Sequence, residues 1–274
     1  MKLLARIFDF YINGSVHVAL AVCALTGITV LEYQLEISNA LWLFIFFGTV
    51  TGYNFVKYAG IAGLHHRSLT RMLKSIQIFS FVSFGILGYV ALQLTQATLL
   101  ITALFAALTF FYAVPISKYK NLRRQGGLKI FIVAVVWAGV TVIVPVVSES
   151  ILWSTSIWLS FIQRILLVIV LILPFEVRDL AFDVAALRTL PQQFGIKKAK
   201  GIGIMLLVIC MLLEGFKYPI ASPHLWSLFL VCVLLGGLLV VSKMKQSRYF
   251  ASFFVEGIPI LWLGVYLLFI YFFS

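Results

Sequence analysis

Nine long apolar stretches run through this sequence, and they fix the solvent in which the chain can fold. Each approaches the roughly 20 residues that a helix needs to cross the hydrocarbon core of a bilayer. A membrane-spanning strand would instead show about 10 residues of alternating polarity, and these stretches do not alternate. The sequence therefore predicts an all-α integral membrane protein, a bundle of nine transmembrane helices at about 12–31, 40–58, 75–93, 97–115, 128–147, 157–175, 201–216, 224–242 and 253–273.

The small number of charged residues supports the same conclusion. Only 11% of the residues are charged and 62% are hydrophobic, whereas a soluble domain carries about 25% charged residues. Such a chain cannot cover a water-facing surface, so residues 1–274 are expected to form a single transmembrane domain. The longest connections, about 59–74 and 176–200, are expected to form cap loops, and long loops often carry function.

The positions of the basic residues predict how the bundle is oriented. With nine spans, the basic clusters near 2–6, 67–74, 118–129, 178–200 and 243–248 all fall on one side, which is expected to be cytoplasmic. The N-terminus then lies in the cytoplasm and the C-terminus outside, with a bacterial inner membrane as the expected location. Topology and contacts with anionic lipid account for the net charge of +12, so no nucleic-acid partner is expected. The opposite side receives Glu32, Glu36, Glu149, Glu214 and Lys217, with Arg164 near it.

Three acidic residues at the end of the sixth predicted span form the strongest candidate site. Glu176, Asp179 and Asp183 are spaced i, i+3 and i+7, so on a helix they share one face. Neighbouring carboxylates repel each other by roughly 3 kcal/mol at an effective dielectric constant of about 20, which favours a bound cation. Oxygen ligands of this kind suit Mg²⁺, often together with a substrate phosphate. The alternative is a solvated acidic face balanced by Arg178 and Arg188.

The loop after these acids adds a more specific pattern. Asp179 and Asp183 are followed by Thr-Leu-Pro at 189–191, and then by Gly195 and Lys198. This stretch, 179–198, resembles the second aspartate-rich motif of the UbiA-type membrane prenyltransferases. The nine spans and the cytoplasmic N-terminus also match that family, and the resemblance extends over most of the chain. Further matches are Tyr112, Pro115, Lys118, Lys120, Trp137 and Pro145.

The resemblance implies a function and a set of site residues. Members of the family hold a prenyl diphosphate through Mg²⁺ in a cavity open to lipid, and they transfer the prenyl group to an acceptor. Here the acceptor is unknown and is expected to be hydrophobic. The resemblance implies that Asp179 and Asp183 are catalytic and that, with Glu176, they bind the metal. Substrate contacts are expected from Asn54, Tyr58, Arg67, Tyr112, Lys118, Arg178 and Lys198.

Other functions remain open at this point. One alternative is a non-catalytic homologue that binds isoprenoid lipids, and another is a terpene-cyclase-like enzyme of the same fold. A transporter would place charges near the bilayer midplane and show internal repeats, whereas the acids here gather at one edge.

The first aspartate-rich motif of the family is degenerate in this chain. Near the end of the second span, where the family has acids, this sequence keeps only Asn54. Asn54, Lys57 and Tyr58 share one helical face. We hypothesise that Lys57 is a catalytic residue that replaces a metal ion, either by contacting the diphosphate or by pairing with Asp179 or Asp183. The alternative is an interfacial lysine that extends its ammonium group to water.

Glu256 is a further acid of interest, at the start of the ninth span and after an aromatic run. The family often has an acid at this place. A metal ligand, a base and a structural partner for Arg248 are the three interpretations of this residue.

Overall fold

The computed structural model describes residues 2–62, 71–114, 127–180, 188–218 and 221–273. These residues form a helical bundle, and the fold class predicted from the sequence is confirmed. In chain order the elements are α1 (Lys2–Asn13), α2 (Val16–Tyr33), α3 (Asn39–Ala62), α4 (Arg71–Ala91), α5 (Gln96–Ala113), α6 (Leu128–Ala138), the π-helix η2 (Gly139–Ile143), α7 (Val144–Ser148), α8 (Thr155–Asp179), α9 (Leu190–Glu214), α10 (Ser222–Val241), the π-helix η4 (Phe250–Val255) and α11 (Ile258–Phe273).

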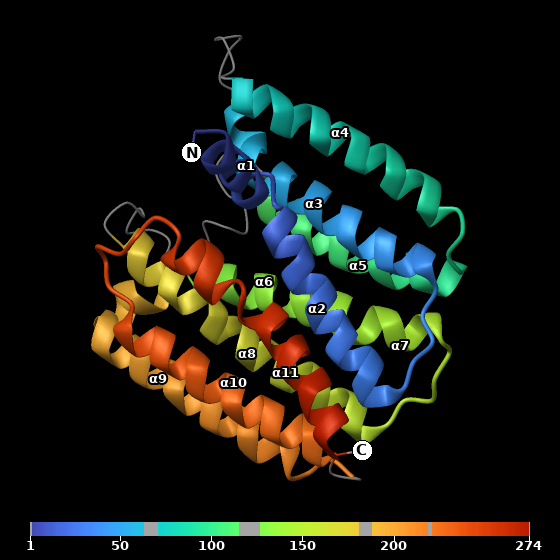
Figure 1. Cartoon of the computed structure of the whole chain (residues 1–274), viewed down its shortest axis with the longest axis vertical. Coiled ribbons are helices and arrows are strands. Elements are labelled where there is room, and N and C mark those ends of the chain that lie inside the picture. Colours follow the sequence, from blue (N-terminus) through green and yellow to red (C-terminus); the bar gives the residue numbers. More distant parts are fainter. Residues whose placement is uncertain (1, 63–70, 115–126, 181–187, 219–220, 274) are drawn as a thin grey trace.

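Eight segments in the described part of the chain are long and apolar enough to cross a membrane. Two of them are composite, because α6, η2 and α7 form the span 128–148 and η4 with α11 forms the span 250–273. The remaining predicted span, 201–216, corresponds to the second half of α9, which ends at Glu214 and lies beside α8 and α10 (Figure 1). Its apolar part, 201–213, is shorter than the others because Lys197, Lys198 and Lys200 precede it and Glu214 follows.

The long helices run side by side with a common tilt (Figure 1). α2, α6 and α8 lie in the interior, whereas α3, α4 and α5 leave most of their surface exposed. We call one end of the bundle the basic end. It carries α1, the ends of α3, α5, α8 and α10, and the starts of α4, α6 and α9. The far end carries the C-terminus (Figure 1). Lys200 joins two of these helix ends, since its Nζ donates to the carbonyls of Val240 and Ser242 at 2.7 and 2.6 Å.

Three local features shape the bundle beyond its hydrophobic pattern. Ser15 has φ 65°, a left-handed conformation that ends α1 and turns the chain into α2. The sequence prediction of a first span at 12–31 missed α1 as a separate helix. Gly195, with φ 78°, kinks α9. Gly139 begins η2 and lets the Phe105 ring of α5 pack directly on its backbone, because a Cβ there would lie 2.0 Å from that ring.

Candidate functional site

The last turn of α8 carries two of the three acids that the sequence analysis proposed as metal ligands. Glu176 is buried, with 1% of its surface exposed. The Asp179 side chain is 32% exposed and accepts two hydrogen bonds from Arg178, at 2.7 Å from Nε and 3.1 Å from Nη2. Asp183 lies outside the described residues. Within the described ranges no three His, Cys, Asp or Glu residues are grouped as a metal site, so the proposed trio stays a prediction.

The face of α3 that carries Asn54, Lys57 and Tyr58 contacts the turn between α1 and α2. Lys57 Nζ donates to Ser15 Oγ at 2.9 Å, and Ser15 Oγ donates to Asn54 Oδ1 at 2.8 Å. Asn54 is buried and its Nδ2 donates to the Gly14 carbonyl at 3.2 Å, while the Tyr58 hydroxyl donates to the Asn13 carbonyl at 3.1 Å. All three residues thus point to the turn between α1 and α2, as their shared face predicted. Lys57 pairs with the Ser15 hydroxyl, whereas Asp179 pairs with Arg178.

Glu256 brings charges from three helices together at the basic end. It follows η4, lies within electrostatic range of Lys57 on α3 and Arg178 on α8, and is half-buried. Arg248 has another partner, because its Nη2 lies 3.1 Å from Asp9 Oδ1 on α1. Lys57 and Arg178 are thus cations whose charges act on this acid.

The other predicted contacts are distributed unevenly. Tyr112 is buried in α5, and Lys198 is exposed on α9. Arg67 and Lys118 lie outside the described residues. Near Lys57, the Tyr53 ring lies 5.8 Å from Nζ, and the Tyr53 hydroxyl accepts a hydrogen bond from Trp137 Nε1 at 2.7 Å. These two aromatic residues join α3 to α6 beside the charged group.

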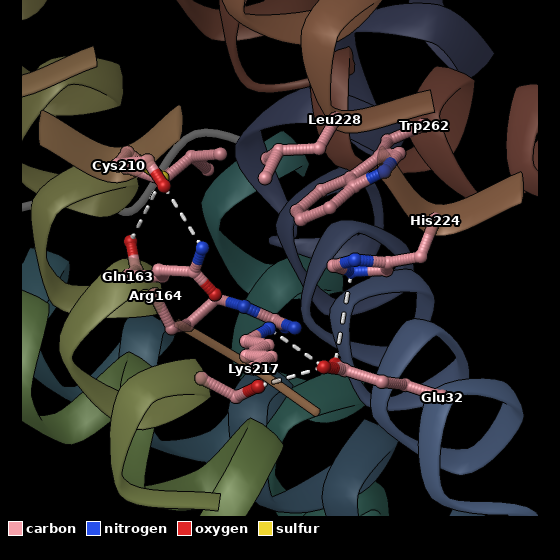
Figure 2. A pocket seen from close by; sticks show the side chains of 10 residues that line it. Glu32, Gln163, Arg164, Cys210, Lys217, His224, Leu228 and Trp262 are labelled. Atoms are coloured by element: carbon pink, nitrogen blue, oxygen red, sulfur yellow. Dashed lines mark hydrogen bonds and ion pairs between the residues drawn. The ribbon is translucent and has the colours of Figure 1, made fainter. Parts of the chain in front are cut away.

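A second polar cluster lies at the far end, and the sequence analysis did not find it (Figure 2). Lys217 Nζ lies 2.6 Å from Glu32 and 3.0 Å from Glu214. The His224 ring lies between the same two acids, with Nδ1 2.7 Å from Glu214 and Nε2 3.7 Å from Glu32. All four side chains are at least nine-tenths buried. The sequence analysis treated the two acids and Lys217 as loop charges, whereas the structure buries them between α2, α9 and α10.

Arg164 completes this far-end cluster from α8. Its guanidinium donates to the Leu25 carbonyl at 2.6 Å and to the hydroxyls of Thr29 and Thr141 at 3.3 Å each. Its charge also lies over the Trp262 ring, 5.4 Å from the ring centre. The small cavity between these side chains measures about 10 Å³, room for about one water molecule. The two acids thus pair with Lys217 and lie beside His224, while Arg164 lines the same cavity, and pairing of this kind makes charged groups tolerable inside a membrane.

Comparison with known proteins sets this geometry in context. No family model matches the sequence, and no curated protein is significantly similar to it. Solved structures do match. A UbiA homologue from Aeropyrum pernix K1, in its apo form, has a TM-score of 0.66 at 15% identity, covering 92% of this chain and 98% of its own. This chain has the UbiA fold.

Two further UbiA-fold structures extend over nearly the whole chain. A UbiA homologue from Archaeoglobus fulgidus, bound to GPP and Mg²⁺, has a TM-score of 0.61 at 12% identity and covers 95% of this chain and 98% of its own. A digeranylgeranylglyceryl phosphate synthase has a TM-score of 0.57 at 16% identity, with 97% of each chain covered. The resemblance found in the sequence is therefore confirmed at the level of the fold.

Proposed function

We propose that this UbiA-fold protein binds a prenyl diphosphate with Mg²⁺ at the basic end of the bundle and transfers the prenyl group to a hydrophobic acceptor. The observation that carries the proposal is the position of Glu176 and Asp179 on the last turn of α8, at the basic end of the bundle, where the charges of Lys57 and Arg178 act on Glu256. One neighbour of the same fold is bound to GPP and Mg²⁺, and another is a digeranylgeranylglyceryl phosphate synthase, which supports this choice of ligand.

The donor set at this end suits Mg²⁺. Carboxylate oxygens are the ligands that this ion prefers, and it commonly shares them with a substrate phosphate. Asp179 is exposed enough to be reached by an ion from solvent. We assign the metal contacts to Asp179, Asp183 and Glu176. When bound, Mg²⁺ supplies positive charge that stabilises the diphosphate as it leaves.

Two side chains of this protein are placed to bind the diphosphate directly. Arg178 now makes a two-point contact with Asp179, and its planar guanidinium offers the same two-point contact to a phosphate group. Lys57 is exposed, and the Ser15 hydroxyl holds its ammonium group in one position. Because this lysine lies within the degenerate first motif, between Phe55 and Tyr58 where the resemblance would place acids, we assign it the role of a fixed charge on the diphosphate. Tyr58, Asn54, Tyr112, Arg67, Lys118 and Lys198 are further proposed contacts.

The test follows the release of diphosphate. Purified protein with Mg²⁺ is incubated with geranyl, farnesyl and geranylgeranyl diphosphate, and candidate acceptors such as aromatic acids and glycerol phosphates are added in turn. We expect release from at least one pair in wild type and its loss in Asp179→Ala. Glu36→Gln, which changes an exposed acid at the far end, is the matched control. Equal rates in wild type and Asp179→Ala would contradict catalysis at this site.

A second candidate function is binding without catalysis. It is favoured by one observation: Asn54, Lys57 and Tyr58, at the degenerate first motif, all bond to the turn between α1 and α2. In this case the protein binds the same diphosphates but releases no diphosphate with any acceptor. Equilibrium binding measured beside the release assay separates the two functions.

A further inference from the structure

α1 precedes the first transmembrane helix in the sequence, and it runs in a different direction from the transmembrane helices. In Figure 1, α1 lies at the basic end and is seen nearly end-on, whereas α2, α3 and α4 are seen from the side. The left-handed Ser15 makes this corner possible. A helix of 12 residues is about 18 Å long, so α1 extends well beyond the corner that anchors it.

The apolar residues of α1 form one stripe with two different environments. Near its C-terminal end the stripe packs on the bundle. The Phe8 ring meets those of Tyr249 and Phe253 at 5.0 and 5.2 Å, and the Phe10 ring meets Phe79 of α4 at 5.5 Å. Near its N-terminal end the same stripe is uncovered, with Leu3 69%, Leu4 72% and Ile7 57% exposed.

The helical repeat fixes the direction in which these uncovered side chains point. At 100° per residue, Leu3, Leu4 and Ile7 fall on the same side of α1 as Phe8 and Phe10. That side faces the bundle, so the uncovered residues face toward the membrane core beside the bundle.

The polar side of α1 fits an anionic headgroup layer. Arg6 lies on this side, Lys2 stands four residues before it in the sequence, and the first turn of the helix contains no acid. Asp9, the one acid of α1, is already neutralised by Arg248 at 3.1 Å and accepts a hydrogen bond from Tyr249 at 2.6 Å. A short helix with basic residues on one side and leucines on the other binds flat on an anionic lipid surface.

We propose that α1 lies in the lipid headgroup layer of the protein's own membrane, with Leu3, Leu4 and Ile7 inserted at the top of the acyl chains. The turn that follows α1 accepts hydrogen bonds from Lys57, at Ser15, and from Asn54, at Gly14, so the lipid surface and the candidate phosphate site are joined through α1 and this turn. The lipid contact stands independently of the proposed function.

The test measures the depth of single positions in the full-length protein reconstituted into vesicles. A nitroxide label is placed at Leu4→Cys, or at Ala5→Cys, which lies about 100° around the same exposed turn, on the polar side with Asp9, in a background where Cys23, Cys210 and Cys232 are alanine. Vesicles are either phosphatidylcholine alone or phosphatidylcholine with one-third phosphatidylglycerol. Relaxation by oxygen, which partitions into lipid, is compared with relaxation by a water-soluble nickel chelate.

The expected result is that oxygen dominates at Leu4 and the nickel chelate dominates at Ala5. The Leu4 label is expected to lie deeper when phosphatidylglycerol is present. Equal access of the nickel chelate to both labels would overturn the proposal, because α1 would then lie in water. Protection of the Leu4 label from both reagents would also overturn it, because a protein surface would then cover the stripe.

Discussion

The Ser15 hydroxyl accepts a hydrogen bond from Lys57 Nζ at 2.9 Å and at the same time donates one to Asn54 Oδ1 at 2.8 Å. The residue that turns the chain between α1 and α2 therefore also positions the candidate phosphate-binding cation. Ser15 and Asn54 are buried, so the hydrogen bond between them is shielded from water, whereas the bond from the exposed Lys57 is only partly buried.

Replacing Ser15 separates the effect of its hydroxyl from that of its backbone conformation. Ser15→Ala leaves Asn54 and Lys57 without this partner, and we expect a loss of about 1–3 kcal/mol in the free energy of unfolding. Ser15→Gly removes the same hydroxyl but relieves a left-handed conformation that costs roughly 1–2 kcal/mol in other residues. Thermal unfolding in detergent should therefore rank wild type above Ser15→Gly and Ser15→Gly above Ser15→Ala. A glycine variant less stable than the alanine variant would contradict this account.

Lys57 is predicted to contribute to diphosphate binding through its charge. We expect Lys57→Met to weaken the binding of a prenyl diphosphate about tenfold, equivalent to about 1.4 kcal/mol. The loss should appear both with and without Mg²⁺, because the lysine charge is fixed. Isothermal titration measures it, with Lys245→Met, an exposed lysine at the basic end, as the control. If Lys57→Met binds the diphosphate with unchanged affinity, Lys57 takes no part in ligand binding, and only its structural contact with Ser15 remains.

Lys217 is predicted to stabilise the far-end cluster. Lys217→Met leaves the buried carboxylates of Glu32 and Glu214 without their shared cation, and breaking a buried ion pair in this way costs about 3–5 kcal/mol. The double variant Lys217→Met/Glu32→Gln should regain part of this loss, because one of the uncompensated charges is gone. Thermal unfolding of the single and the double variant tests these two expectations, with Lys243→Met, at an exposed lysine, as the control. A double variant less stable than Lys217→Met alone would argue against a charge effect.

Gly139 is predicted to be required by the packing of α5 against η2. Gly139→Ala places a methyl group where the Phe105 ring lies, and overpacking of this kind costs about 1–3 kcal/mol. Gly85→Ala in α4 is the control, since a Cβ there meets nothing within 4 Å. Phe105→Leu should lessen the cost of Gly139→Ala in a double-variant cycle of melting temperatures. Independent, additive effects would show that the two residues are not in contact.

The fold was predictable because the membrane imposes a simple rule on the sequence. Backbone polar groups in lipid must be satisfied internally, so long apolar runs become helices, and short connections place them antiparallel. The capping sequence Thr-Leu-Pro-Gln at 189–192 likewise marks the start of α9, where the Thr189 amide donates to Gln192 Oε1 at 3.1 Å. The separate α1 was not predicted, because its apolar residues merge with the first span and Ser15 gives no sign of a left-handed turn.

The two polar clusters differ in how visible they are in the sequence. Glu176 and Asp179 are neighbours on one helix turn, and Asn54, Lys57 and Tyr58 share one face, so spacing alone brought each set together. Glu32, Arg164 and His224 are far apart in the chain, and only the packing of α2, α8 and α10 joins them. The available signals were Arg164 inside a predicted span and the interruption of another span by Glu214 and Lys217.

The most direct measurement is the equilibrium binding of geranyl diphosphate to the purified protein, with saturating Mg²⁺ and again with the ion removed by EDTA. We expect saturable binding that weakens at least about tenfold without Mg²⁺ and to the same extent in Asp179→Asn. Magnesium should then have no further effect in that variant. Binding that is equally tight with and without Mg²⁺ in wild type, or unchanged in Asp179→Asn, would contradict a metal-held diphosphate at the end of α8.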